Sequence, residues 1–289
     1  MIAQQILNGF IMGNTYVLIA LGFTLVFGIV DIHNFAHGEL YMVGAFAVFF
    51  FYKIFNIPFV LALLLGMVVT GFVGVLFDLV GFRPLRKSPP VATLISSIAL
   101  MLLASDGALL AFGADPKYFT TSYADKILRF GGLTLSLQRL LIVIVAVGLV
   151  LLLNLFIRKT RMGMAMRACA QNRQAAGWCG VNFDFISFVT FGISGALAAA
   201  AGGLMVPMTG AEPTMGMGAL LKAFAVVILG GMGNVPGAIV GGYIIGFSEA
   251  LSVATIGATY KNVAPFATII LVLIIKPSGI FGQKVQVKL

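Results

Sequence analysis

The chain has 289 residues, of which 60% are hydrophobic and only 9% are charged, and its mean hydropathy is +1.08. Soluble domains carry about 25% charged residues, so this composition excludes a water-soluble globular protein. The formal net charge is +9, but the basic residues lie in short groups between apolar runs, which is typical of cytoplasmic membrane loops and not of a nucleic-acid-binding surface.

Long uncharged runs approach or exceed the ~20 residues that a helix needs to cross a bilayer. In chain order, the clearest are Met1–Val30, Ile54–Phe77, Ser88–Ser105, Leu140–Ile157 and Phe185–Ala211. The first lacks a basic start and a small-residue cleavage site, so we interpret it as a span and not as a signal peptide. With the apolar segments between and after these runs, the pattern predicts an all-α fold, a polytopic transmembrane bundle of about 8–9 spans with broken or re-entrant segments. We expect residues 1–289 to form a single domain.

Three basic groups predict how the spans are oriented. They are Arg83, Arg86 and Lys87; Arg158, Lys159, Arg161, Arg167 and Arg173; and Lys276, Lys284 and Lys288. Together they hold 11 of the 18 Lys and Arg residues, so all three groups, and the C-terminus, should be cytoplasmic. The loops Gly113–Gln138 and Thr209–Gly218 should then lie outside, as should the N-terminus if the first two segments are both full spans.

The first break in the pattern lies after the first span. Leu40–Tyr52 offers only 13 uncharged residues, about 20 Å as a helix against about 30 Å of hydrocarbon, so it must recruit part of Asp31–Glu39. His33 and His37 are four residues apart, and we expect them on one helical face. That arrangement suggests either a divalent-metal or proton-relay site or, as the favoured interpretation, polar groups that hydrogen-bond the backbone of neighbouring helices; we predict no metal site.

The second break is the glycine-rich stretch Gly230–Gly237, inside the uncharged run Ala223–Ser248. Four glycines and a proline do not continue a helix comfortably. Either the flanking halves extend through Glu212–Lys222 and Glu249–Tyr260, or they are half-helices that meet at a turn. Irregular backbone at membrane depth is tolerated only in protein or along a cavity, so both breaks are candidates for the translocation path. The candidate path residues are Asn34, His37, Gly38, Glu39, Gly230, Gly231, Gly233, Asn234 and Pro236.

Four isolated ionisable residues lie in spans or at their ends: Asp78, Asp106, Lys222 and Glu249. Because charge inside a membrane is expensive, each is a candidate functional residue. For Asp78 we expect an ion pair with the nearby Arg83. Asp106 is equally consistent with a boundary residue that is hydrated from outside.

The basic loop Arg158–Asp184 has the spacing of one amphipathic helix that ends near Gly180. Such a helix either lies on anionic lipid or docks into a groove of a partner. Its candidate contact residues are Arg161, Gly163, Arg167, Gln171, Asn172, Arg173, Ala175 and Gly180. Cys169 and Cys179 both fall in this loop, where we expect them to stay reduced.

The chain lacks the motifs of common enzymes. It has no GxxxxGK[ST] phosphate-binding loop, no GxSxG elbow, no CxxC pair and no HExxH motif, so it is not by itself a P-loop ATPase. We predict neither enzymatic activity nor a cofactor.

Several short motifs, spread over nearly the whole chain in one order, resemble those of LivH-type permeases of branched-chain amino acid ABC transporters. They are Asn34–Gly44, Arg83–Arg86, Arg161–Ala170, Gly180–Asn182, Lys222–Phe224, Leu229–Ala238 and Pro277–Gly282. The chain departs from the family pattern at Asp31, His33 and Ser105–Asp106, and in the loop Gly113–Gln138.

The resemblance implies an importer subunit in a bacterial inner membrane. In that family the permease works with a second, related permease (LivM-type), two cytoplasmic ABC ATPase subunits and a periplasmic amino-acid-binding protein. The basic loop, about residues 171–179, would be the coupling helix on an ATPase, and the outer loops would receive the binding protein. Alternatives are a urea or short-chain amide permease, an ion-coupled transporter with proton sites at Asp31, Asp106 or Glu249, and, third, an intramembrane metalloenzyme using His33, His37 and Glu39.

Overall fold

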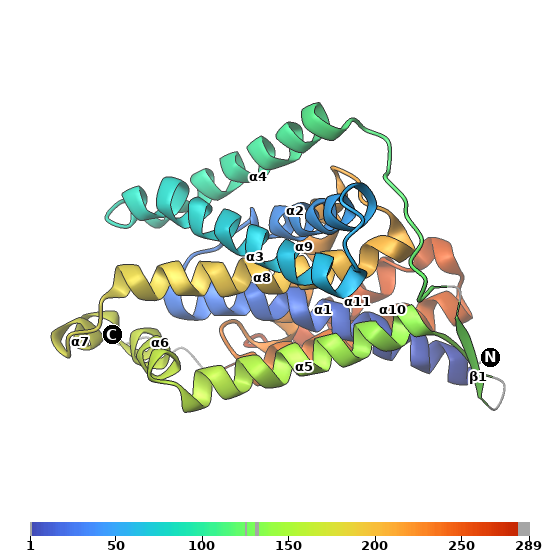
Figure 1. Ribbon diagram of the computed structural model, residues 1–289. Coiled ribbons are helices and arrows are strands. Elements are labelled where there is room, and N and C mark those ends of the chain that lie inside the picture. Colours follow the sequence, from blue (N-terminus) through green and yellow to red (C-terminus); the bar gives the residue numbers. More distant parts are fainter. Residues whose placement is uncertain (1, 125, 131–132, 283–289) are drawn as a thin grey trace.

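The computed structural model describes residues 2–124, 126–130 and 133–282, and it is built almost wholly from helices (Figure 1). The first half contains α1 Ile2–Val30, α2 His37–Phe49, α3 Phe59–Phe77, α4 Pro90–Phe112 and α5 Leu137–Lys159. The second half contains α6 Arg161–Gln171, α7 Arg173–Trp178, α8 Phe183–Thr209, α9 Met215–Gly230, α10 Val235–Thr255 and α11 Val263–Ile275. Short π-helical or 3₁₀ segments are Phe50–Ile54, Asp78–Phe82, Arg83–Leu85 and Ala258–Tyr260. An antiparallel hairpin, β1 Ile127–Phe130 and β2 Leu133–Ser136, precedes α5.

Six described helices are long and apolar enough to cross a membrane: α1, α3 with its continuation, α4, α5, α8 and α10. The predicted all-α membrane bundle is thus confirmed in its class. α2, α9 and α11 are shorter, with 13, 16 and 13 residues, so the count of eight or nine spans stays a prediction.

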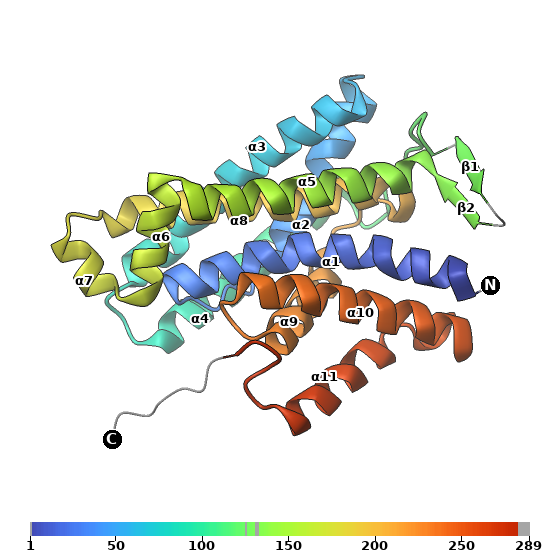
Figure 2. The same ribbon diagram turned by 90° about the horizontal axis from the view of Figure 1, so that it is seen from below.

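The long helices run back and forth between two ends of the molecule, as Figures 1 and 2 both show. We call one the hairpin end, because it carries β1–β2, the start of α1 and the α8–α9 turn. There Gln4 Nε2 donates to the Thr134 carbonyl at 3.0 Å, and Lys117 and Ala211 exchange two backbone hydrogen bonds. The two loops that we expected on one side therefore do lie together.

The opposite end, which we call the basic end, carries the α3–α4 turn, α6, α7 and the α9–α10 turn (Figure 1). Arg83 and Arg86 of the first basic group contact Asp184, next to the second basic group. The predicted clustering of these groups at one end is confirmed for the described residues; Lys284 and Lys288 lie outside the described part of the chain.

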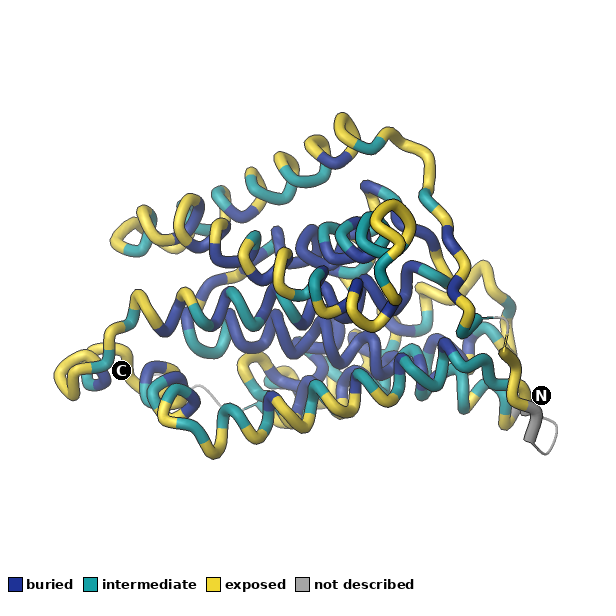
Figure 3. Tube along the Cα trace, viewed as in Figure 1, coloured by how far each residue is buried: buried dark blue, intermediate teal, exposed yellow. Residues whose placement is uncertain are grey.

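Burial is strongest in α1 and α8, which lie at the centre of the bundle (Figure 3). In their most apolar stretches 83% and 78% of residues are buried, against 6% in α4. α4 stands apart from the other helices along most of its length (Figure 1). Its apolar outer side chains therefore face lipid or another protein.

Small residues let α8 approach α2 closely. A Cβ atom on Gly44 would lie 2.2 Å from the Ala199 Cα, and one on Gly202 would lie 2.2 Å from the Tyr41 carbonyl oxygen. Such distances leave no room for a larger side chain, so close backbone packing of the small-xxx-small kind holds this helix pair together.

Candidate functional site

The first predicted break is a short non-helical linker between α1 and α2. α1 ends at Val30, and Asp31 has a φ of +59°, which a right-handed helix cannot contain. α2 begins at His37, so the apolar segment does recruit part of the polar stretch as expected. The prediction that His33 and His37 share one helical face is wrong, because the linker is not helical. His33 is exposed, whereas His37 is fully buried.

His37 is held by two hydrogen bonds inside the bundle. Its Nε2 lies 2.9 Å from the Ile19 carbonyl oxygen, and its Nδ1 lies 3.2 Å from the Ser194 hydroxyl. A carbonyl only accepts, so Nε2 carries a proton and donates to Ile19, while Nδ1 pairs with the Ser194 hydroxyl. The ring thereby ties α2 to α1 and α8. This contact pattern matches the favoured interpretation, in which polar side chains of the break bond to neighbouring backbone.

Other polar atoms of the break have no such partner. Both side-chain atoms of Asn34 and the Oε2 atom of Glu39 are buried without a hydrogen bond to any described residue. The hydroxyls of Thr15 and Thr24 on α1 are likewise buried without a hydrogen bond to any described residue. An unpartnered buried polar group costs about 1–3 kcal/mol and calls for an explanation such as water, a ligand or a solute in transit.

The second break is a tight turn between two packed helices, and it lies at the basic end. The turn Gly231–Asn234 places Gly233 against Gly28, two residues before the end of α1. Asn234 caps α10, accepting the Gly237 N–H at 2.8 Å, and Pro236 occupies the first turn of α10. The flanking helices extend to Met215 and Thr255. Both helices thus extend beyond the apolar halves and also meet at a turn beside the end of α1. Because α9 has only 16 residues, a re-entrant arrangement of this segment stays a prediction.

Two cavities lie at opposite ends of the bundle. The basic-end cavity, about 790 Å³, is lined by residues 27–30 of α1, residues 31–32 of the linker, Arg86, residues 169–173 and residues 232–234. The hairpin-end cavity, about 410 Å³, is lined by Met12, Thr15, Tyr16 and Ile19 of α1 and by parts of α9 and α10. Both cavities are therefore lined by α1, but at different places along it. The hairpin-end cavity contacts α1 between Met12 and Ile19, and the basic-end cavity contacts it between Phe27 and Val30.

An aromatic layer separates the cavities along α1. The Phe23 ring centroid lies 4.7 Å from that of Phe224 and 5.8 Å from that of His37, and Phe35 stacks on Phe224 at 5.3 Å. Phe23 is 2% exposed. His37, a predicted path residue, is thus part of the closed layer between the cavities.

The hairpin-end cavity ends on a charged cluster that sequence reasoning found only in part. Lys222 Nζ lies 2.9 and 3.0 Å from the two carboxylate oxygens of Glu249, and 2.6 Å from the Tyr16 hydroxyl. Tyr16 in turn donates to Glu249 at 2.5 Å. Lys222 and Glu249 stood out as isolated charges, but Tyr16 is 206 positions away from Lys222, and only the fold brings it to them.

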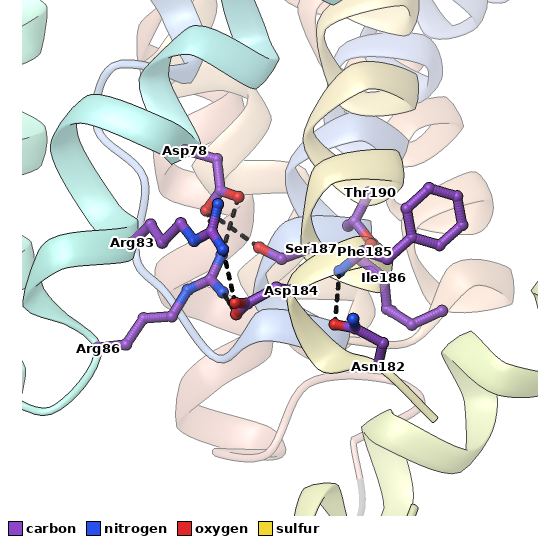
Figure 4. A network of polar contacts seen from close by, with 9 residues as sticks. All are labelled: Asp78, Arg83, Arg86, Asn182, Asp184, Phe185, Ile186, Ser187 and Thr190. Atoms are coloured by element: carbon purple, nitrogen blue, oxygen red, sulfur yellow. Dashed lines mark hydrogen bonds and ion pairs between the residues drawn. The ribbon is translucent and has the colours of Figure 1, made fainter. Parts of the chain in front are cut away.

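A second charged network lies at the basic end (Figure 4). Arg86 Nη2 donates to both oxygens of Asp78, and its Nη1 donates to Asp184. Ser187 adds a 3.0 Å hydrogen bond to Asp78, and Arg83 bonds Asp184 at 2.9 Å. The expected Asp78–Arg83 pair is therefore wrong: the π-helical continuation of α3 turns Asp78 towards Arg86 and leaves Arg83 at the surface.

The basic loop forms two helices, not the single helix that we predicted. α6 buries Met166 and Cys169 against Ala176 and Ile186, and its Gly163 lies against the Phe156 and Ile157 backbone of α5. It leaves the predicted contact residues Arg161, Arg167 and Gln171 exposed, so its amphipathic character is confirmed.

Asn172 separates α6 from α7, because its backbone is extended, with φ −158°. Its side-chain oxygen accepts the Ala175 N–H at 3.0 Å and so caps the start of α7. Arg173 stacks over the Phe183 ring at 3.5 Å. Gly180, with φ +84°, ends the turn after α7 in a conformation that favours glycine.

The remaining charged candidates do not assemble into a site. Asp106 is exposed on the peripheral α4, and Asp31 is exposed at the basic-end cavity. Within the described ranges, no three His, Cys, Asp or Glu side chains come together as a metal-binding group would require.

Comparison with known proteins places this geometry in a family. The sequence profile of "Branched-chain amino acid transport system / permease component" matches residues 5–273. The chain is 38% identical to the high-affinity branched-chain amino acid transport system permease protein LivH of Escherichia coli (strain K12), over 97% of this chain and 95% of that one. It is 35% identical, with the same coverage, to the corresponding permease protein BraD of Pseudomonas aeruginosa.

Two further similarities are more distant. The ribose import permease protein RbsC of Escherichia coli (strain K12) is 30% identical over 40% of this chain. PsaBC from Streptococcus pneumoniae, solved in complex with Fab, superimposes with a TM-score of 0.54 at 10% identity, covering 96% of this chain and 97% of that one. At that identity the likeness concerns the fold alone.

The family match covers most of the chain, and it agrees with the resemblance carried by the short motifs. The chain is a multi-pass membrane permease and not an enzyme, and it belongs to the permease component family of branched-chain amino acid transport systems.

Proposed function

We propose that the chain forms one half of the translocation path of an ABC importer for branched-chain, aliphatic amino acids. The observation that carries this proposal is the pair of cavities at opposite ends of α1, separated by one closed aromatic layer around Phe23. A permease needs access from each side in turn, and a closed layer between two cavities is the resting form of such a path. The branched-chain permeases LivH and BraD, similar over 97% of the chain, supply the substrate class.

We place the basic end in the cytoplasm of a bacterial cell and the hairpin end outside the inner membrane. Basic residues favour cytoplasmic loops, and the basic end holds the Arg83–Lys87 turn and α6–α7. In this orientation the hairpin-end cavity receives the solute and the basic-end cavity releases it. The last described residues, up to Gly282, line the basic-end cavity, which accords with a cytoplasmic C-terminus.

The predicted path residues fall into two groups on this route. Asn34, His37, Gly38 and Glu39 lie at or beside the closed layer, and the unpartnered polar atoms of Asn34 and Glu39 suit a route that water or solute occupies during transport. Gly230, Gly231, Gly233, Asn234 and Pro236 lie at the exit, where Gly233 and Asn234 line the basic-end cavity. Their turn would move with α9 and α10 when the exit opens.

The energy source would lie on other chains. The sequence has no phosphate-binding loop, and α7 offers a short exposed helix beside the basic-end cavity, with Trp178 85% exposed. We assign α6–α7 as the coupling segment for one of two cytoplasmic ATPase subunits. A related second permease of the LivM type would cover outward apolar faces such as that of α4, and an amino-acid-binding protein would dock on the hairpin end.

Uptake by the reconstituted assembly tests the substrate class. We expect vesicles holding both permeases, both ATPases and the binding protein to accumulate labelled leucine, with excess unlabelled isoleucine and valine competing and urea or acetamide not competing. Competition by urea or acetamide, with none by the aliphatic amino acids, would instead establish the amide-permease alternative.

A further inference from the structure

The hairpin-end cavity ends at the middle of the bundle. Tyr16 is the midpoint of α1, which runs from residue 2 to residue 30, and Lys222 is the eighth of the 16 residues of α9. Thr209, Glu212 and Lys261 line the same cavity nearer the hairpin end. The charged cluster Tyr16–Lys222–Glu249 is thus reached from the hairpin end and lies near the middle of α1 and α9.

Stability does not explain why a charged pair lies near the middle of these helices. The Glu249 side chain is 8% exposed and that of Lys222 is 21% exposed. Taking two charges out of water costs several kcal/mol each, and well-packed apolar residues of similar volume often stabilise a protein as much or more. Ionisable residues inside a membrane segment are therefore functional candidates by default. The pair also faces a cavity, where a solute can reach both of its charges.

The surroundings of the pair suit an aliphatic zwitterion. Thr15, 3% exposed, lines the cavity with a hydroxyl that has no hydrogen-bond partner among the residues described. Met12, Ile19 and Met205 supply apolar wall beside it. A volume of about 410 Å³ lies within the ~300–1,000 Å³ of small-molecule sites.

We propose that Tyr16, Lys222 and Glu249 form a transient subsite for the α-ammonium and α-carboxylate groups of the transported amino acid. The inference rests on the proposed function and names the site within it. The carboxylate of the solute takes the place of Glu249 on Lys222, while its ammonium group takes the place of Lys222 on Glu249. Two ion pairs replace one, with no change in net charge, so the buried charges stay compensated. Thr15 bonds the carboxylate, and the apolar wall takes the side chain.

Cysteine alkylation tests the subsite without altering the pair. Ala219 lines the cavity one turn before Lys222, so its replacement Ala219→Cys, in a Cys179→Ser background, places a thiol beside the cluster. In right-side-out vesicles with the assembled transporter, a membrane-impermeant maleimide should alkylate this thiol. Saturating leucine should slow alkylation about fivefold or more, whereas 4-methylpentanamide, which carries the same branched chain and no charge, should not.

Matched variants assign the effect to the charges. Lys222→Met or Glu249→Gln should abolish protection by leucine, and Lys261→Met, a change at another wall of the cavity, should leave it intact. Equal protection by the amide, or no protection by leucine in a preparation that imports leucine, would overturn the subsite alone. Absence of leucine import from the same vesicles would overturn the proposed function and, with it, this subsite.

Discussion

Arg86 donates two hydrogen bonds from one nitrogen to both carboxylate oxygens of Asp78, at 2.7 and 2.8 Å, where the two side chains are 7% and 1% exposed. The Ser187 hydroxyl of α8 donates to the same carboxylate, and Arg86 Nη1 donates to the Asp184 carboxylate. The end of α3 and the start of α8 are therefore joined through one guanidinium, directly beside the basic-end cavity.

Replacement Arg86→Met should destabilise the permease strongly, because it leaves Asp78 buried without its cation. Loss of one partner of a buried ion pair costs about 3–5 kcal/mol. Arg83→Met is the matched control: its pair with Asp184 is about half exposed on both sides, and such pairs contribute about 1 kcal/mol or less. Thermal unfolding in detergent measures both, and equal melting temperatures for the two variants would contradict the assignment.

Replacement Gly44→Ala should separate α2 from α8, since the new Cβ would lie 2.2 Å from the Ala199 Cα. Overpacking of this kind costs about 1–3 kcal/mol. Gly148→Ala on α5 meets nothing within 4 Å and should leave stability unchanged or raise it, because alanine favours helix. The unfolding midpoints of the two variants test this, and a Gly44→Ala protein as stable as the wild type would refute the close contact.

Replacement Asn172→Ala should weaken coupling, because it removes the oxygen that caps the six-residue helix α7. Loss of such a cap costs about 1 kcal/mol, which is large for a helix that short. We expect ATP hydrolysis by the assembled transporter to respond several-fold less to loaded binding protein. Asn172→Asp keeps a capping oxygen and should restore the response. If the alanine variant responds normally, α7 is not the coupling element.

The two cysteines report on whether α7 docks on an ATPase. Cys179 is exposed, whereas Cys169 is 5% exposed and burial raises the pKa of its thiol, an effect that the Arg173 cation partly opposes. The thiolate is the reactive form, so in the isolated permease at pH 7.5 maleimide should modify Cys179 at least about tenfold faster than Cys169.

Mass spectrometry of the assembled transporter should then find Cys179 protected, because in the proposed assembly the coupling segment would lie in a groove of an ATPase. Labelling of Cys179 at the same rate with and without the ATPase subunits would show that α7 stays free, and the lipid-surface interpretation of the basic loop would gain support.

Much of the architecture follows from local sequence. The apolar runs predict α1, α3, α4, α5 and α8 to within a few residues at most ends, because each run is bounded by charges, prolines or glycines. The grouping of Arg83–Lys87 with Arg158–Arg173 at one end follows from loop charge alone. The polar stretch Asp31–Glu39 predicts a break after Val30. It does not predict the non-helical backbone of the linker, because the same sequence is compatible with a helix.

The contacts between distant segments could not be predicted. Asp78 lies one turn from Arg83, and only the π-helical turn at Asp78–Phe82 directs it to Arg86 instead. The break at Asn172 depends on a capping bond that competes with continued helix. Tyr16 looks like one aromatic residue among many on α1, and its role depends on α9 and α10 packing against it, more than 200 positions later.

The source of energy for transport tests the central proposal most directly: that this chain provides the path and other chains drive it. Labelled leucine uptake should be measured in vesicles holding the full assembly with internal ATP, in the same vesicles without ATP, and in vesicles holding this chain alone under a proton gradient. We predict accumulation in the first case only. Accumulation by the chain alone under the proton gradient would contradict the account and establish an ion-coupled transporter in its place.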